Sequence, residues 1–260
     1  MCLITFAYQS HPEYSFILLA NRDEFYARPS QSMHFWQDHP EVLAGRDLEQ
    51  GGTWLGINQT GRFAAVTNYR DGRNRKADGI TRGDLTRSYL IKTEGAGGYI
   101  DRLEENKNLY GDFNLLLGDR QGLYYCSNRG EKSRALSAGI YGMSNALLDT
   151  PWPKLEYAKA KLQALLANPT LSESDLIEIM LNPSTARDEH LPDTGVSLEW
   201  ERLLSSCFIQ AENYGTRATT LILQKPSGET VITELSFDQH GKTEQKTFAL
   251  NVDPIGANQE

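Results

Sequence analysis

Paired cysteines are missing from this sequence, and with them the usual ligands of structural metal sites. The three cysteines, Cys2, Cys126 and Cys207, lie far apart and form neither a CxxC pair nor a Cys/His cluster. Zinc sites and disulfide frameworks both depend on such spacings. We therefore expect no metal site and no disulfide framework.

The chain also lacks an excess of positive charge and a long apolar run. Its net charge of −8 at pH 7 opposes non-specific nucleic-acid binding, which requires a basic surface, and docking on anionic lipid. No apolar run approaches the ~20 residues of a membrane helix, and Tyr8-Gln9-Ser10 interrupts the first run before it is long enough for a signal peptide. We expect a cytoplasmic protein without an integral membrane segment; the sequence does not specify its oligomeric state.

Repeats, low-complexity tracts and long linkers are absent too. The 260 residues are 39% hydrophobic and 23% charged, which is ordinary for a globular protein with a sizeable core. This length lies at the upper end of the range for one domain. We predict a single domain over residues 1–260.

What the sequence does contain begins with a hairpin. The runs CLITFAY (2–8) and YSFILLA (14–20) are apolar, β-branched and aromatic, and Ser10, His11 and Pro12 separate them, which predicts two antiparallel strands. Because antiparallel partners return on themselves, Cys2 should meet the cluster Asn21-Arg22-Asp23-Glu24 at one end of a sheet.

Further strands are predicted near both ends of the chain. Residues 51–68 (GGTWLGINQTGRFAAVTN) indicate two strands around a turn, residues 113–128 indicate a hairpin, and 140–145 a short strand. After residue 206 the β-rich segments are 207–210, 217–224, 230–237 and 246–250.

Helical patterns lie between these groups of strands. The predicted helices are 85–90, 99–109, 153–166 and 172–181, the last with a capped start at Ser172. Residues 70–83 are basic and irregular, which indicates an exposed loop. The order favours an α+β fold with two antiparallel sheets face to face and helices outside them.

Cys2 is the candidate nucleophile. Removal of Met1, which is common before a small residue, would leave a thiol and a free α-amine on Cys2. The amine has a pKa of ~8 and the thiol one of ~8.5, so one residue supplies both nucleophile and base. Arg22 would hold the thiolate or orient a carbonyl, and Asp23 would anchor the α-ammonium. The alternative is that Cys2 is a small buried hydrophobe. If Met1 stays attached, Cys2 has no free α-amine and the nucleophile mechanism cannot operate.

Three further polar residues stand at strand ends. Asn68 closes FAAVTN, Asn145 closes IYGMSN, and Arg217 opens RATTLIL. Amide-bond chemistry requires donors aimed at a developing oxyanion, and an Asn side chain can provide them. For each Asn the alternative is an Asx-turn or helix cap, and for Arg217 a solvated surface position.

These motifs together resemble a known family. MCLITFAY, NRDE, GGTWLGIN, VTNYR, YGMSN and YGTRATT resemble the NRDE family, also called the transport and Golgi organisation protein 2 family, from residue 1 to about residue 225. More distantly, the layout is similar to the cysteine amino-terminal-nucleophile hydrolases, such as penicillin V acylase and bile salt hydrolase. That resemblance implies a four-layer αββα sandwich and cleavage of non-peptide amide bonds in small molecules.

The resemblance also implies roles for individual residues. It makes Cys2 the nucleophile, maps Arg22 and Asp23 onto the arginine and aspartate after the second strand, and maps Asn68 and Asn145 onto the two active-site asparagines. Arg217 matches a late active-site arginine. Arg22 and Asp23 are adjacent here, whereas the hydrolases separate them, so Asn21 is a candidate to share the role of Arg22; Glu24 has no counterpart.

Two functions follow from this reading. The first is hydrolysis of a small acyl amide or ester without a cofactor, in which Asn21, Glu24, Trp54 and Tyr69 contact the substrate. The aromatic residues Trp36, Trp54, Tyr69 and Trp152 would favour an apolar substrate if they line the cleft, and we expect at least two of them to pack in the core.

The second function is a non-enzymatic carrier on the same fold. The eukaryotic family has been linked to Golgi organisation, lipid homeostasis and haem trafficking, so the resemblance admits a haem or lipid ligand. Haem requires an axial ligand, for which Cys2, Met33 and His34 are candidates.

Overall fold

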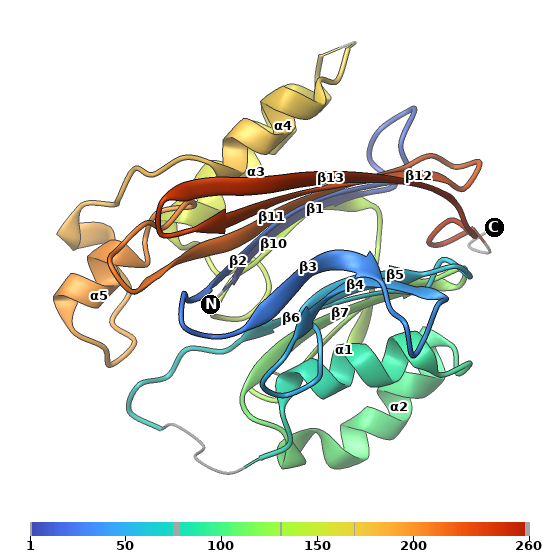
Figure 1. Cartoon of the computed structure of the whole chain (residues 1–260), viewed down its shortest axis with the longest axis horizontal. Coiled ribbons are helices and arrows are strands. Elements are labelled where there is room, and N and C mark those ends of the chain that lie inside the picture. The colour runs from blue at the N-terminus through green and yellow to red at the C-terminus, as the bar shows by residue number, and fades with distance from the viewer. Residues whose placement is uncertain (1, 75–78, 131, 169, 258–260) are drawn as a thin grey trace.

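Two antiparallel sheets lie face to face in the computed structural model, which describes residues 2–74, 79–130, 132–168 and 170–257 (Figure 1). The first sheet has the order β10-β1-β2-β11-β12-β13 and the second β3-β4-β5-β6-β7-β8-β9. The first sheet comprises β10 (Gly139–Met143), β1 (Cys2–Tyr8), β2 (Phe16–Phe25), β11 (Tyr214–Gln224), β12 (Glu229–Asp238) and β13 (Gly241–Asn251). The second comprises β3 (Ser30–Phe35), β4 (Val42–Asp47), β5 (Leu55–Asn58), β6 (Phe63–Asn68), β7 (Phe113–Asp119), β8 (Gly122–Ser127) and β9 (Arg134–Leu136).

Helices cover the outer face of each sheet (Figure 1). Helices α1 (Arg82–Ile91) and α2 (Ala96–Asn106) pack on the second sheet, and α3 (Pro153–Leu166) and α4 (Glu173–Met180) on the first. Helix α5 (Leu198–Leu203) lies in the segment between α4 and β11. The resulting order of layers is helix, sheet, sheet, helix, which confirms the four-layer αββα sandwich and the α+β class.

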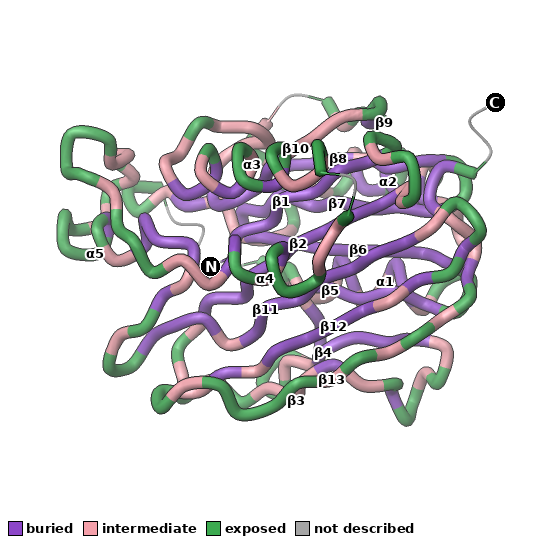
Figure 2. The backbone as a smooth tube through the Cα atoms, turned by 90° about the horizontal axis from the view of Figure 1, so that it is seen from above, coloured by how far each residue is buried: buried purple, intermediate pink, exposed green. Residues whose placement is uncertain are grey.

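Strand alternation produces the three cores between these layers. In β2, Phe16 and Leu18 face the other sheet, whereas Ile17 and Leu19 face the helices, because successive side chains of a strand point to opposite faces. Both inner sheets are therefore buried along most of their lengths, while the edge strand β13 is largely exposed (Figure 2). Among the residues that the structure describes, no helix is both long and apolar enough to cross a membrane.

The predicted elements agree closely where the sequence pattern is strong. The opening hairpin, the hairpin at 113–128 and the helix at 153–166 are confirmed, and Ser172 caps α4 by accepting a hydrogen bond from the backbone N–H of Asp175. Strands β3, β4 and β9 and helix α5 were not predicted.

The strand predicted at residues 207–210 is wrong. This segment bends and makes only an isolated bridge between Gln210 and Gly215. Its backbone groups bond elsewhere: the N–H of Phe208 donates to Asn182 O, and the N–H of Ile209 donates to the hydroxyl of Thr216. An apolar run does not form a strand when its backbone N–H groups donate to such loop and side-chain acceptors instead of to a neighbouring strand.

Candidate active site

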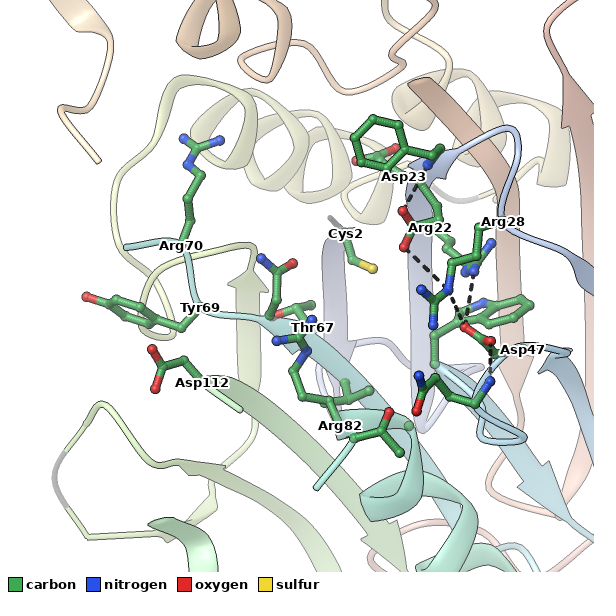
Figure 3. A pocket seen from close by; sticks show the side chains of 18 of the residues that line it. Cys2, Arg22, Asp23, Arg28, Asp47, Thr67, Tyr69, Arg70, Arg82 and Asp112 are labelled. Atoms are coloured by element: carbon green, nitrogen blue, oxygen red, sulfur yellow. Dashed lines mark hydrogen bonds and ion pairs between the residues drawn. The ribbon is translucent and has the colours of Figure 1, made fainter. Parts of the chain in front are cut away.

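A cavity of about 550 Å³ opens where the strands of both sheets end. One wall comes from β1, β2 and β11, and the other from β6, the segment before β5 and the start of α1. Figure 3 shows the Cys2 thiol between Arg22, Arg28 and Asp47 on one side and Thr67 on the other. The expected meeting of the chain start with the end of β2 therefore occurs at a cavity.

Cys2 opens β1 directly opposite Arg22 of β2. Its side chain is largely buried, with 9% of the residue exposed. Burial raises the pKa of the Cys2 thiol and Asp23 raises it further, whereas Arg22 and a hydrogen bond from the backbone N–H of Asp23 lower it. The thiol thus has a cation and a backbone donor beside it, both of which stabilise a thiolate.

Arg22 is fixed by stacking and by polar contacts. Its guanidinium carbon lies 4.3 Å from the centre of the Trp54 ring, and its nitrogens reach Ser30 Oγ at 3.4 Å and Asp47 Oδ2 at 3.8 Å. Trp54 has room because residue 45 is glycine: a Cβ there would lie 2.2 Å from the indole ring. The cation beside Cys2 is held in one orientation by both sheets.

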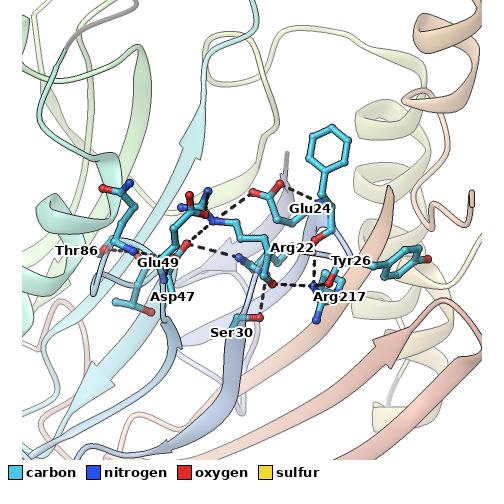
Figure 4. A network of polar contacts seen from close by, with 12 residues as sticks. Arg22, Glu24, Tyr26, Ser30, Asp47, Glu49, Thr86 and Arg217 are labelled. Carbon is cyan, nitrogen blue, oxygen red and sulfur yellow. Dashed lines mark hydrogen bonds and ion pairs between the residues drawn. The ribbon is translucent and has the colours of Figure 1, made fainter. Parts of the chain in front are cut away.

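Asp47 links Arg22 to the next arginine along the chain (Figure 4). Arg28 Nε donates to Asp47 Oδ2 at 2.6 Å, and the backbone N–H groups of Glu49 and Gln50 donate to Oδ1. Burial works against the charged form, but these hydrogen bonds bring the pKa of the Asp47 carboxyl below its ordinary value. Asp47 is therefore an anionic anchor for the two cations of this wall.

Asp23 is buried beside Cys2 and lines the cavity. Its Oδ1 accepts a hydrogen bond from the hydroxyl of Thr216 at 2.7 Å. Burial raises the pKa of the carboxyl, while the buried ammonium of Lys154, at the start of α3, lowers it. Asp23 stands where it can bind a cation at the start of β1.

The opposite wall is held by the segment after β10. Asn145 Nδ2 donates to the backbone oxygen of Asn68 at 3.0 Å and to its Oδ1 at 2.9 Å. Ser144 Oγ donates to Cys2 O at 3.0 Å, and Thr67 Oγ1 donates to Ser144 O at 2.5 Å. The bond to Oδ1 uses the acceptor of the Asn68 amide and leaves its NH₂ donors for the cavity that Asn68 lines.

Asn145 itself lies outside the lining of this cavity and is fully buried. Its two hydrogen bonds to Asn68, together with those of Ser144 and Thr67, tie β10, β1 and β6 into one frame. Asn145 therefore acts on the site through Asn68.

The four residues of the Asn-Arg-Asp-Glu cluster divide between the two faces of β2. Asn21 faces the helices: its Nδ2 donates to Met180 O at 2.8 Å and to Cys207 O at 2.9 Å. Asn21 does not line the main cavity. Its hydrogen bonds connect the end of α4 to the first sheet. Glu24 lines the cavity and lies 3.9 Å from Arg28 Nε.

Arg217 also lies outside the main cavity. The pairing of β11 with β2 shifts between Thr216 and Ala218, so Arg217 occupies a bulge. Its Nη1 donates to the backbone oxygens of Phe25, Tyr26 and Arg28, and its Nε to Phe237 O. Arg217 thus holds the turn that follows β2.

Aromatic residues form the rim of the cavity. Phe25 packs edge-on against Tyr214 at 5.0 Å between ring centres, and Trp200 against Tyr214 at 5.4 Å. All three line the cavity, and Phe25 is 49% exposed. Trp54 and Tyr69 line it as well, whereas Trp36 and Trp152 pack in the outer layers, as expected for two of the four.

Several residues at the cavity were not predicted from the sequence. Ser144 and Tyr214 stand inside the motifs YGMSN and YGTRATT, so their position beside Asn145 and near Arg217 was a usable signal. Arg28, Asp47, Phe25 and Trp200 offered none, since their roles depend on contacts between strands and helices that are distant in sequence.

The candidate haem ligands do not converge on this cavity. Met33 is packed in the core between the sheets, and the His34 Nδ1 lies 2.7 Å from Ser32 O. Of the three candidates, only Cys2 lines the main cavity. Within the described parts of the chain, no group of three or more His, Cys, Asp or Glu side chains is placed to hold a metal ion.

A four-layer fold with a cysteine at the start of an inner strand is the arrangement that the resemblance to amino-terminal-nucleophile hydrolases implies. The chain belongs to the transport and Golgi organisation 2 family, whose model matches residues 1–239. It is 37% identical to the transport and Golgi organization protein 2 homolog of Bos taurus, covering 91% of this chain and 93% of that protein. The Homo sapiens homolog is 36% identical over 96% and 99% of the two chains.

Solved structures are similar at low sequence identity. The Caenorhabditis elegans N-acylethanolamine-hydrolyzing acid amidase ortholog is 11% identical, with a TM-score of 0.48 over 69% of this chain and 85% of that chain. A mutant of the conjugated bile acid hydrolase from Clostridium perfringens is 10% identical, with a TM-score of 0.42 over 98% of both chains. Both scores are below 0.5, and the layer order stated above rests on the sheets and helices of this chain.

Proposed function

We propose that this protein is a cysteine amino-terminal-nucleophile hydrolase of a small amide or ester with an apolar acyl group, active after removal of Met1. The observation that carries the proposal is the grouping of Cys2, Arg22 and Asp23 opposite Asn68 across one cavity. A nucleophile, a cation, an anion for the α-ammonium and an amide donor are the parts that acyl transfer requires.

In the first half of the reaction, the α-amine of Cys2 accepts the thiol proton and the thiolate attacks the substrate carbonyl carbon. Arg22 stabilises the thiolate, and the NH₂ group of Asn68 donates to the oxyanion. The C–N or C–O bond then breaks, and the leaving amine or alcohol takes the proton from the α-ammonium. The acyl group remains on Cys2 as a thioester.

In the second half, water attacks the thioester and gives its proton to the α-amine. The carboxylic acid leaves, and the proton returns to the Cys2 sulfur. Asp23 supports both halves because its carboxylate favours the ammonium form at the moment when it carries the extra proton. The aromatic rim of Phe25, Trp200 and Tyr214 supports an apolar acyl group.

Comparison of Cys2→Ala with Cys126→Ala tests this function. Cys126 is fully buried in the outer core of the second sheet, so its variant controls for loss of a thiol. Turnover of a panel of acyl amides and esters should vanish in Cys2→Ala and persist in Cys126→Ala. Equal turnover in both variants would overturn the proposal, and binding without turnover in the wild-type chain would favour a carrier of haem or lipid.

A further inference from the structure

The loop that follows β10 is bonded to strands of the sheet to which β10 does not belong. Strand β10 pairs with β1 in the first sheet as far as Ile4 opposite Met143, and residues 144–148, the bridging loop, come next in the chain. Three backbone groups of this loop bond to side chains of the second sheet: Ser144 O to Thr67 of β6 at 2.5 Å, Ala146 O to Asn114 of β7 at 2.9 Å, and the Leu148 N–H to the hydroxyl of Tyr125 of β8 at 3.1 Å. The second sheet therefore holds the bridging loop in place.

Asn114 connects these three hydrogen bonds. Its side chain is fully buried. Besides Ala146 O, its Nδ2 donates to Thr67 Oγ1 at 3.2 Å, and its Oδ1 accepts a hydrogen bond from the hydroxyl of Tyr125 at 2.8 Å. The donors and the acceptor of the amide are thus both used. Asn114 binds the loop directly and also binds the two other side chains that hold it.

The pattern of β7 shows that packing does not require an amide at residue 114. Leu116, two residues further on, lies on the same face of the strand and packs in the core between the sheets, so a leucine at residue 114 would continue that apolar face. A buried amide costs free energy unless it is hydrogen-bonded. We therefore attribute the amide of Asn114 to the bridging loop rather than to the core.

The bridging loop carries two side chains that reach the candidate site. Ser144 Oγ donates to Cys2 O at 3.0 Å, and Asn145 Nδ2 donates to Asn68 Oδ1 at 2.9 Å. Cys2 lies beyond the last residue pair of β1 and β10, so on this side the Ser144 hydroxyl takes the place of a backbone partner. The loop therefore contacts both the residue of the candidate nucleophile and the residue of the candidate oxyanion donor.

We propose that Asn114 is a positioning residue, which fixes Cys2 relative to the amide of Asn68 through the bridging loop. Asn114 does not line the main cavity, so it touches neither the substrate nor the reacting sulfur. Acyl transfer depends on this geometry, because a misplacement of ~1 Å can cost about 10²-fold in rate. The effect on turnover rests on the proposed hydrolase function, whereas the hold on the start of β1 does not.

Two asparagines of the second sheet allow a matched comparison. Asn114→Asp replaces the donor that faces the bridging loop by an oxygen and keeps an acceptor for Tyr125. Asn58→Asp makes the same change in β5 at a residue that is also buried. Asn58 Nδ2 donates to Leu90 O at 3.0 Å, in α1, and Asn58 does not line the main cavity. Both variants lose a buried donor, but only Asn114→Asp removes one from the bridging loop.

Hydrogen–deuterium exchange followed by mass spectrometry measures the hold on the site without any substrate. In Asn114→Asp, exchange in the bridging loop and at the start of β1 should be about tenfold faster than in the wild-type chain, since loss of a buried hydrogen bond shifts the local opening equilibrium by about this factor. In Asn58→Asp, faster exchange should be confined to β5 and the end of α1.

Steady-state kinetics with an acyl amide or ester that the wild-type chain hydrolyses separates positioning from folding. Asn114→Asp should lower kcat about 10- to 100-fold and leave KM within about twofold. Asn58→Asp should leave kcat and KM unchanged. An unchanged kcat in Asn114→Asp, or an equal loss of kcat in the two variants, would overturn the proposal.

Tyr125→Phe decides if Asn114→Asp does not fold. It removes the hydroxyl that Asn114 and the Leu148 N–H share, and it should lower kcat about threefold or more with KM unchanged; an unchanged kcat would overturn the proposal. If the wild-type chain hydrolyses no compound of the panel, the proposed hydrolase function fails. Exchange then decides alone, and wild-type exchange at the start of β1 in Asn114→Asp would overturn the role of Asn114.

Discussion

The same three strands have opposite characters at their two ends. At one end of β1, β2 and β6, Tyr8, Phe16 and Phe63 are fully buried between the sheets, and the rings of Phe16 and Phe63 pack edge-on at 5.3 Å. At the other end, the same strands present Cys2, Arg22 and Asn68 to a cavity of about 550 Å³. A change from apolar to polar side chains along each strand marks the boundary between them.

One end of these strands therefore contributes to the stability of the fold, and the other end carries the polar groups of the candidate site. Burial of aromatic side chains at the packed end contributes roughly 1.5–3 kcal/mol for each large side chain. At the cavity end, burial instead disfavours the charged forms of Arg22 and Asp23, which costs free energy. The free energy gained by packing at one end of the strands therefore offsets the cost of burying charged groups at the cavity end.

The largest effect is expected at the packed end. Phe16→Ala removes a fully buried ring from the core between the sheets and should lower the free energy of unfolding by about 3–5 kcal/mol. Urea unfolding followed by circular dichroism measures this. A loss below about 1 kcal/mol would show that the packed end does not carry the stability.

Glu234 should make stability fall as the pH rises. Burial raises its pKa from 4.5 to about 7 in the folded chain, so its contribution is fully present below pH 4.5 and is lost as the pH rises through about 7. Between these values the wild-type chain should lose about 3 kcal/mol relative to Glu234→Gln. Urea unfolding of both chains from pH 4.5 to 8 gives the difference between their free energies of unfolding. The same pH dependence of that free energy in both chains would contradict a raised pKa of Glu234.

Asn145 offers a test of the frame around the cavity. Asn145→Ala removes both hydrogen bonds to Asn68 and leaves their acceptors unsatisfied, which should cost about 1–3 kcal/mol of stability and lower kcat. Asn68→Ala is the matched variant, because it removes the amide that lines the cavity itself. If Asn145→Ala leaves both unfolding and kcat unchanged, the frame does not position Asn68.

The smallest effect on stability is expected at the aromatic rim. Phe25→Ser replaces a half-exposed side chain and should change the free energy of unfolding by no more than about 0.5 kcal/mol. It should raise KM for long-chain acyl substrates and leave KM for acetyl substrates unchanged. Steady-state kinetics with a chain-length series measures this, and equal changes for all lengths would exclude the rim as an acyl site.

The packed end and the opening hairpin could be predicted from sequence because alternation and turn residues specify them locally. The register that places Cys2 opposite Arg22 follows from the hairpin alone. The same alternation places Asn21 on the face opposite to Arg22, so a shared role for these two was open to doubt from the pattern itself. Strand β3 was missed because its run SQSMHF is polar-rich, and β4 because its apolar run VLA is too short to show a period.

The cavity end depends on contacts that no local pattern encodes. Arg217 points to the turn after β2 because a bulge displaces it from the ladder, and bulges of this kind leave little trace in a single sequence. The pairing of Arg28 with Asp47 and the burial of Glu234 arise only when β3 and β4 dock on the first sheet. These residues could be found only from the folded chain.

Intact-mass analysis of the purified protein, before and after incubation with an acyl amide or ester, tests the central proposal most directly. The expected mass lacks Met1, and a slow substrate should add one acyl group at Cys2 that is absent from Cys2→Ala. A chain that retains Met1 would contradict the amino-terminal-nucleophile mechanism, and a processed chain that is never acylated would contradict the hydrolase itself.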